Sequence, residues 1–264
     1  MTPLFGVTID SVYPTPDIVE ALRRHSHRPT TRIVFDELVP ATDYRQAAAA
    51  IHGVSYVLGE ILDSFYVKQY SVQDYLARTT EYLGFLGDVV DIWEIGNEIN
   101  GEWLGKTADV VAKMAGAYDL VKAGGYRTAL TLYYNEDCWE SPSNEMFTWA
   151  QANVPARMKA GLDYVLMSYY EDDCNGLQPN WQAVFDRLGE MFPSARIGFG
   201  ECGTSSSSRK KEYIDRYYRM QINHPRFIGG YFWWYYKQDM VPYTNKLWSA
   251  LEAAVASWPS TTWQ

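Results

Sequence analysis

Two glutamates lie at the ends of apolar, β-rich segments of this sequence, each with glycine close by. Glu98 ends the segment WEIGNE, and Glu201 lies within GFGECG. An unpaired carboxylate at the end of an apolar strand is costly, and a neighbouring glycine lets another molecule approach the backbone. Two carboxylates that face each other can cleave a glycosidic bond when one is protonated and the other is ionised. An apolar pocket would raise one pKa, while hydrogen-bond donors would hold the other low.

The elements that must position these glutamates repeat along the whole chain as a short apolar segment, a polar loop and an amphipathic helix. The β-rich segments are 4–10, 31–37, 55–63, 89–98, 127–135, 162–170, 195–203 and 227–236. Strands that alternate with helices pair in parallel, and a parallel sheet needs both faces covered. Eight such units predict an α/β fold, a single (β/α)8 TIM barrel over residues 1–264 with short βα loops. An open doubly wound sheet is the alternative, but no glycine-rich phosphate loop follows the first strand.

In such a barrel the active site lies at the carboxyl ends of the strands, so the polar residues there are the candidates. Carboxylates dominate this set, and we expect one or two to bind sugar and the others to cap loops: Asp10, Asp36, Glu37, Glu60 and Asp63. The histidines are expected at solvated helix ends, which argues against a histidine metal site and a Ser-His-Asp triad: His25, His27, His52 and His224. The acidic run 171–173 is interpreted as a solvated turn, so neither a metal nor a cofactor is expected.

The composition narrows the classes of partner that the protein can be expected to bind. Lys and Arg number 23 against 32 Asp and Glu, a net charge of -9, which lacks the basic surface of a nucleic-acid binder. No apolar run approaches the ~20 residues that span a bilayer, so no membrane partner is expected. Aromatic residues make up 16% of the chain, with 10 Trp and 21 Tyr, which suggests surfaces that stack on a ligand. We expect a monomer whose partner is a carbohydrate.

Three cysteines are too few for a disulfide scaffold, and none forms a CxxC pair. Cys138 and Cys174 lie in successive loops and form either a disulfide or two free thiols. Cys202 is expected to point away from Glu201 and to pack. No signal peptide is visible, which leaves localisation open: cytoplasmic as written, secreted or periplasmic if a leader was removed.

The pair Asn97-Glu98 at the end of the fourth strand, with Glu201 at the end of the seventh, resembles clan A of the glycoside hydrolases. These enzymes are retaining (β/α)8 barrels with the acid/base on strand four and the nucleophile on strand seven. The resemblance implies that Glu98 is the acid/base, that Glu201 is the nucleophile and that Asn97 binds the sugar 2-OH. No family within the clan is assigned.

Further roles follow from the same resemblance. It implies that Arg32 supports the nucleophile, that Tyr169 or Tyr170 hydrogen-bonds it and that Trp233 or Trp234 floors the central sugar subsite. Tyr133, Tyr134 or Asn135 is a candidate for the sugar contact that a histidine makes in many clan members. Trp103, Trp139 and Trp181 lie in loops near the expected mouth, where each either stacks on sugar or packs. Glu94 is expected to be a buried partner of Arg32.

We therefore predict a retaining glycoside hydrolase that cleaves a β-linked polysaccharide or oligosaccharide. Short loops would leave a groove, which favours an endo mode. Two alternatives remain at this point. One is a non-catalytic carbohydrate-binding barrel, and the other is a Schiff-base lyase that uses Lys237.

Overall fold

A closed barrel of eight parallel strands forms the centre of the protein, and each strand pairs with its neighbours in chain order. The computed structural model describes residues 4–256 and 258, so residues 1–3, 257 and 259–264 of the expected domain lie outside the described residues. The strands are β1 (Leu4–Ile9), β2 (Thr30–Val34), β3 (Tyr56–Glu60), β4 (Ile92–Glu94), β5 (Arg127–Tyr133), β6 (Tyr164–Tyr169), β7 (Arg196–Cys202) and β8 (Phe227–Trp233). The predicted (β/α)8 barrel is confirmed.

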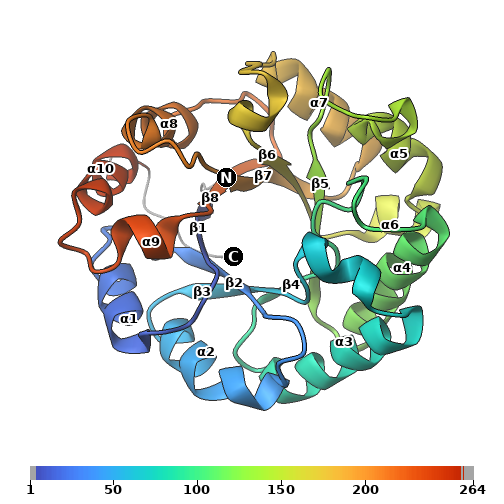
Figure 1. The fold of residues 1–264 in the computed structure, drawn as a ribbon, viewed down its shortest axis with the longest axis horizontal. Helices are drawn as coiled ribbons and strands as arrows, with labels where there is room; N and C mark the ends of the chain where they lie inside the picture. The colour runs from blue at the N-terminus through green and yellow to red at the C-terminus, as the bar shows by residue number, and fades with distance from the viewer. Residues whose placement is uncertain (1–3, 257, 259–264) are drawn as a thin grey trace.

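Helices form an outer ring around the strands (Figure 1). The α-helices are α1 (Thr15–Arg23), α2 (Arg45–His52), α3 (Val72–Leu86), α4 (Thr107–Ala123), α5 (Met146–Asn153), α6 (Ala156–Gly161), α7 (Trp181–Met191), α8 (Lys210–Tyr218), α9 (Tyr236–Met240) and α10 (Lys246–Val255). Short 3-10 helices are η1 (Ala41–Tyr44), η2 (Ser64–Gln69), η3 (Pro142–Asn144) and η4 (Glu171–Cys174). No helix among the described residues is long and apolar enough to cross a bilayer.

Two apolar layers hold the barrel together. One lies between strands and helices and contains most of the buried apolar residues. The other consists of eight side chains that alternate with these along the strands and fill the barrel interior: Leu4, Leu58, Ile92, Ala129, Tyr164, Leu166, Ile228 and Phe232. The interior is therefore a packed core, and space for a ligand remains only at the carboxyl ends of the strands.

The fourth strand is much shorter than predicted. It covers only Ile92–Glu94, although alternation was expected to continue to Glu98. Beyond Glu94 the chain still bonds to β5, because Ile95 donates to the carbonyl of Ala129 and Ile99 to that of Thr131. Between these two bonds the backbone turns, and Glu98 adopts a left-handed conformation with φ 47°. Such a conformation is strained for a residue other than glycine.

Two of the four histidines are buried, which corrects their expected placement at solvated helix ends. His25 is 8% exposed and His27 9% exposed. The His25 ring stacks on Trp248 of α10 and lies 2.8 Å from a carboxylate oxygen of Glu252. Burial lowers the pKa of His25, with the Glu252 carboxylate opposing that shift. His25 therefore joins the end of α1 to α10 and takes no part in the site at the strand ends.

Candidate active site

Glu98 and Glu201 line the same cavity at the carboxyl ends of the strands. The left-handed turn at Glu98 brings two consecutive side chains, Asn97 and Glu98, to this cavity, whereas a regular strand would send them to opposite faces. Glu201 follows Gly200, where an added Cβ would lie 2.7 Å from the Cβ of Leu166. A side chain at position 200 would thus push β7 off β6, next to the residue that carries the carboxylate.

The Glu201 carboxylate receives two strong hydrogen bonds. Arg32 donates from Nη1 to Oε2 at 2.8 Å, and the Tyr170 hydroxyl donates to Oε1 at 2.6 Å. Burial raises the pKa of Glu201 to about 8, with Arg32 and Tyr170 opposing and the charge of Glu98 adding to the shift. The cation and the hydroxyl both stabilise the ionised form of Glu201 and so oppose the effect of burial.

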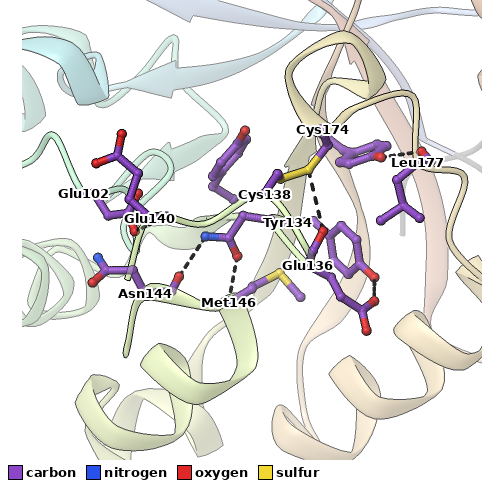
Figure 2. The surroundings of a disulfide bond; sticks show 12 residues. Glu102, Tyr134, Glu136, Cys138, Glu140, Asn144, Met146, Cys174 and Leu177 are labelled. Atoms are coloured by element: carbon purple, nitrogen blue, oxygen red, sulfur yellow. Dashed lines mark hydrogen bonds between the residues drawn. A yellow bond between two sulfur atoms is a disulfide. The ribbon is translucent and has the colours of Figure 1, made fainter. Parts of the chain in front are cut away.

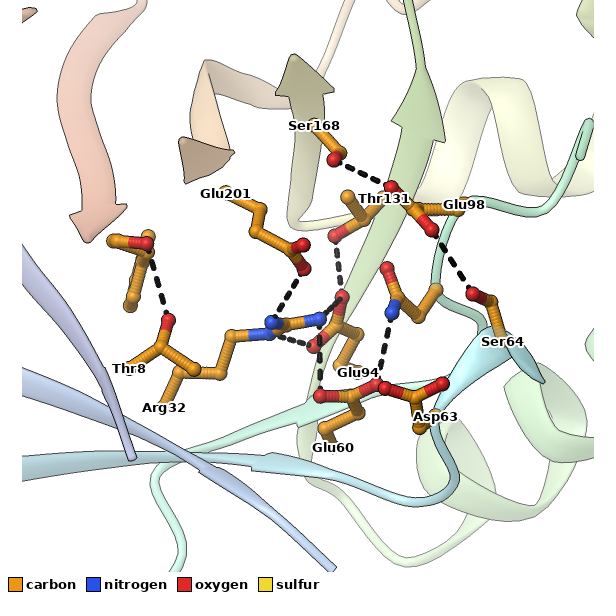
Figure 3. Close-up of polar contacts among 12 residues, drawn as sticks. Thr8, Arg32, Glu60, Asp63, Ser64, Glu94, Glu98, Thr131, Ser168 and Glu201 are labelled. Carbon is orange, nitrogen blue, oxygen red and sulfur yellow. Dashed lines mark hydrogen bonds and ion pairs between the residues drawn. The ribbon is translucent and has the colours of Figure 1, made fainter. Parts of the chain in front are cut away.

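Arg32 is fully buried and forms ion pairs with three carboxylates (Figure 3). Its Nε lies 2.6 Å from Glu94, its Nη2 lies 3.0 Å from Glu60, and its Nη1 faces Glu201. Burial disfavours the charge, but the three carboxylates raise the pKa of Arg32 well above its ordinary value. The expected pairing of Glu94 with Arg32 is confirmed, and Arg32 thereby connects the floor of the site to Glu201.

Glu98 has a different environment, because the side chains that donate to it within the described part of the chain are two serine hydroxyls. Ser168 donates to Oε1 at 2.7 Å and Ser64 to Oε2 at 2.9 Å (Figure 3). Burial raises the pKa of Glu98, and the two serines oppose that shift. The indole Nε1 of Trp103 donates to Ser64 Oγ at 3.0 Å, which orients the serine toward the glutamate. Both groups that donate to Glu98 are thus neutral, whereas one of the two groups that donate to Glu201 is a cation.

Asn97 lies at the floor of the cavity and is 2% exposed. Its Nδ2 donates to Oε1 of Glu60 at 2.9 Å, and its Oδ1 is buried with no hydrogen-bond partner. Glu60 is also fully buried, and burial raises its pKa well above the ordinary value. Glu60, one of the possible sugar ligands, thus lies beneath the site and supports Asn97.

The structure separates the two adjacent tyrosines. Tyr170 faces the cavity and reaches Glu201, together with Ser168 two positions earlier on the same face of β6. Tyr169 points the other way, is fully buried and donates its hydroxyl to the backbone carbonyl of Leu177. Tyr169 therefore does not face the cavity, and its candidate role in the site is wrong.

The two tryptophans at the end of β8 are separated in the same way. Trp234 lines the cavity and lies 5.7 Å above the Arg32 guanidinium. Trp233 is fully buried, and its Nε1 donates to Asp239 at 2.9 Å. Trp233 is therefore a packing residue, while Trp234 offers its ring to a ligand.

The cavity has a volume of about 480 Å³. Its walls come from the segments that follow β3, β4, β6 and β8 and from the ends of β5 and β7. The lining residues are Asp63, Ser64, Phe65, Asn97, Glu98, Trp103, Tyr133, Tyr170, Asp173, Glu201, Trp234 and Tyr235. Sequence reasoning missed Ser64, Phe65, Ser168, Asp173 and Tyr235 as site residues, whereas Tyr133 was one of the candidates for the sugar contact of the histidine and does line the cavity. Ser168 had a detectable signal, since it lies two positions before Tyr170. The others lie in loops whose course the sequence does not reveal.

Asn135 and Trp139 do not line the cavity. Asn135 is buried, its Nδ2 donates to the carbonyl of Asn144 at 2.9 Å, and its Oδ1 accepts from the Met146 amide at 3.0 Å (Figure 2). Its amide therefore holds the loop after β5 and has no free atom for sugar. Trp139 is 38% exposed and lies outside the lining of the cavity.

A disulfide joins Cys138 to Cys174 and settles the alternative left open by the sequence (Figure 2). It connects the loop after β5 to η4 after β6. Cys202 is fully buried with its Sγ near the carbonyl of Tyr231, which confirms its expected packing. Trp181 packs against Tyr169, with ring centroids 4.8 Å apart, between the barrel and α7, and so does not lie at the mouth.

The acidic run 171–173 is not a freely solvated turn, which corrects that interpretation. Glu171 is buried and pairs with Arg216 of α8, and Asp172 pairs with Arg209. Among the described residues, no group of three His, Cys, Asp or Glu is arranged to hold a metal ion. Lys237 lies in α9 and does not line the cavity, so it is not positioned to form a Schiff base there.

Solved structures of Saccharomyces cerevisiae Gas2p share this fold. The complex with laminaritriose and laminaritetraose matches with a TM-score of 0.61 at 11% identity, over 100% of this chain and 66% of that chain. The complex with laminaripentaose matches with a TM-score of 0.60 at 11% identity and the same coverage. This chain thus spans just under two thirds of the Gas2p chain. No protein-family model matches the chain, and no curated protein matches its sequence.

Proposed function

We propose that this protein is a glycoside-hydrolase-type enzyme that acts by double displacement, with Glu98 as acid/base and Glu201 as nucleophile. The observation that carries the proposal is the unequal surroundings of two glutamates in one cavity. Glu201 is bonded by a guanidinium and a phenol, whereas Glu98 is bonded by two serine hydroxyls. A pair of carboxyls with opposed environments is what acid and nucleophile roles require.

In the first step, ionised Glu201 attacks the anomeric carbon while protonated Glu98 gives its proton to the departing glycosidic oxygen. The bond to the leaving sugar breaks, and an ester forms between Glu201 and the remaining sugar. Arg32 and Tyr170 stabilise the charged form of the nucleophile and fix its position before attack. In the second step, Glu98 takes a proton from water or a sugar hydroxyl, which displaces Glu201 with net retention.

The aromatic walls of the cavity support a sugar ligand. Trp234, Trp103 and Tyr235 are half-buried and line the cavity, so each can present part of a ring to an apolar sugar face. The cavity lies between short loops, which supports attack within a chain. Gas2p has been solved in complex with laminari-oligosaccharides, and these sugars are suitable first substrates to test on this protein.

The test is hydrolysis of a panel of β-linked oligosaccharides followed by chromatography and proton NMR. We expect products of internal cleavage whose anomeric configuration is initially retained. Products longer than the substrate would identify transfer to sugar in place of water. Glu98→Gln and Glu201→Gln should each abolish turnover of the natural linkage.

Glu102→Gln is the matched control, since Glu102 accepts from the amides of Glu140 and Ser141 outside the cavity lining. It should keep its activity. Activity at the wild-type level in either Glu98→Gln or Glu201→Gln contradicts the proposal. Glycan binding without release of any product would identify a binding protein instead.

A further inference from the structure

The cavity contains more negative charge than glycoside cleavage requires. Four carboxyl groups line it, those of Asp63, Glu98, Asp173 and Glu201, and no Lys, Arg or His is among its described lining residues. Two of these groups, Asp63 and Asp173, have no part in the proposed chemistry. They come from the loops after β3 and β6, two strands that are not neighbours in the barrel.

Asp173 is the acidic residue of η4 that is left without a cation. Arg216 neutralises Glu171, and Arg209 neutralises Asp172. The Asp173 side chain forms neither an ion pair nor a hydrogen bond within residues 4–256, and Asp173 lines the cavity. Arg209 at the N-cap of α8 and Arg216 within it thus each pair with one acid of η4, and neither pairs with Asp173.

Asp63 is in a similar position across the cavity. One carboxylate oxygen accepts the amide of Phe65 at 2.8 Å at the start of η2. No cation in the described part of the chain pairs with it, and its charge acts on Glu98 and Glu201, whose pKa values it raises. The protein therefore tolerates a charge here that makes both glutamates harder to ionise.

The nearest cations are engaged elsewhere. Arg32 lies under the floor with its three carboxylates. Lys210 lies 4.6 Å from the Tyr235 ring centroid but pairs with Asp239, and Lys68 lies 5.8 Å from the Phe65 ring centroid on the outer side. None of the three lines the cavity. The field in the cavity is therefore negative on both sides of the glutamate pair.

A second observation, independent of these charges, also points to a hydrogen-bond donor. Oδ1 of Asn97 is buried at the floor of the cavity and has no partner, although a buried polar atom without a hydrogen bond is costly. Its amide nitrogen is already bound to Glu60, so the free atom is an acceptor. The floor and both sides thus present acceptors to whatever fills the space.

We infer that the substrate is a cationic glycan, a polymer of amino sugars with free amines, and that Asp63, Asp173 and Asn97 Oδ1 receive its ammonium and hydroxyl donors. This inference rests on the proposed function and names its substrate class. Glycans with uronate or sulfate groups are excluded by the same charges, since like charges brought together repel. Neutral glycans can donate hydroxyl hydrogen bonds to the two aspartates but bring no positive charge to pair with them.

The test is calorimetric binding to the full chain carrying Glu98→Gln, which is uncharged like protonated Glu98 and should not turn over the glycan. The probes are β-1,4-linked glucosamine oligosaccharides and their N-acetylated counterparts of equal length, which share one backbone and differ in charge. At mildly acidic pH, where the amines are protonated, we expect the free-amine form to bind about tenfold more tightly. Added salt should remove most of that difference.

Further substitutions, made in the Glu98→Gln chain, test whether the two aspartates cause the difference in affinity between the probes. Asp63→Asn and Asp173→Asn should each weaken binding of the free-amine form by about threefold to tenfold and leave the N-acetylated form unchanged. Asp172→Asn is the matched control, because Asp172 is paired with Arg209 outside the cavity lining. It should change the affinity for neither the free-amine nor the N-acetylated form.

The inference is overturned if the N-acetylated oligosaccharide, a neutral glucan or a glucuronan binds as tightly as the free-amine form. It is also overturned if neither aspartate substitution discriminates between the two probes. If either of these binding results is obtained but the protein cleaves a neutral glucan with retained anomeric configuration, the inference fails and the proposed function stands. Absence of cleavage on every glycan would instead remove the proposed function, while the calorimetry still decides the charge preference.

Discussion

The Asn97 side chain donates from Nδ2 to Oε1 of the buried Glu60 at 2.9 Å. The other oxygen of Glu60 lies 3.0 Å from Nη2 of Arg32, whose Nη1 reaches Glu201. One carboxyl group therefore connects the residue before the proposed acid/base to the arginine that holds the proposed nucleophile. Burial raises the pKa of Glu60 well above the ordinary value, and the Arg32 cation opposes that shift.

Glu60→Gln should lower kcat by about tenfold, because an amide has one acceptor where Glu60 uses two, and a lost hydrogen bond at a charged group costs about 1.5–3 kcal/mol. Either Asn97 or Arg32 then loses its partner. Steady-state kinetics and thermal unfolding of the same variant check this. A change in unfolding temperature with unchanged kcat and KM would assign Glu60 to the fold alone.

Tyr170→Phe removes the hydroxyl that bonds to Glu201 and should lower kcat by about tenfold to a hundredfold. The lost bond favours the ionised form, so the pKa of Glu201 rises and the acid limb of the pH–rate profile moves to higher pH. The profile of kcat/KM measures this shift.

Tyr169→Phe is the matched control for that experiment. Its hydroxyl bonds to the carbonyl of Leu177 behind the barrel wall, so the substitution should cost about 1 kcal/mol of stability and leave the pH profile unchanged. An equal change in the profiles of Tyr169→Phe and Tyr170→Phe would contradict the assignment of Tyr170 to the nucleophile.

Ser64→Ala and Ser168→Ala each remove one hydroxyl that donates to Glu98. These bonds lower the pKa of Glu98 against the effect of burial, so each substitution should raise it. The alkaline limb of the pH–rate profile, which follows loss of the proton from Glu98, should move to higher pH by about half a unit to one unit. A shift confined to the acid limb would contradict the acid/base role of Glu98.

The barrel could be predicted from sequence because its signal repeats in every unit: a β-rich segment followed by an amphipathic helix. Glu98 and Glu201 were found because each lies at a strand end beside glycine. The choice between Tyr169 and Tyr170, or between Trp233 and Trp234, could not be made. It depends on which face of the strand points inward, and one residue of register reverses that face.

Other features depend on contacts between distant segments. The burial of His25 is caused by Trp248 and Glu252, more than 200 positions later in the chain. Asn135 is not available to the site because its side chain bonds to the backbone of Asn144 and Met146. The turn at Glu98 replaces a predicted strand, since pairing with β5 is interrupted there. None of these contacts leaves a pattern in the local sequence.

Glu201→Gln should abolish activity and also stabilise the protein at alkaline pH. The pKa of Glu201 rises from about 4.5 in the unfolded chain to about 8 in the folded protein, chiefly through burial. The folded state therefore binds the extra proton between these values, and stability falls as pH rises through this window. Above about pH 8 the glutamine variant should be more stable by about 5 kcal/mol, because each pKa unit between about 4.5 and about 8 corresponds to about 1.4 kcal/mol, with no gain below about pH 4.5. Urea unfolding across this range measures the difference, and a gain that is independent of pH would contradict the linkage.

Removal of the disulfide should destabilise the protein and also affect the ligand space. Cys138 and Cys174 are 36 positions apart, and a closed loop of this size contributes about 3 kcal/mol. Cys138→Ser with Cys174→Ser should therefore lower the unfolding temperature by about 10 °C. Because Cys174 follows Asp173 directly, the same variant should bind the free-amine oligosaccharide more weakly.

Reductant provides the control for that variant. It should lower the unfolding temperature of the wild type toward that of the double variant and leave the double variant unchanged, since Cys202 is buried and unpaired. A wild type that is insensitive to reductant after unfolding and refolding in its presence would contradict a stabilising role. Weaker binding of both the free-amine and the N-acetylated probe would show that the disulfide shapes the whole cavity. Weaker binding of the free-amine probe alone would show that it positions the charge of Asp173.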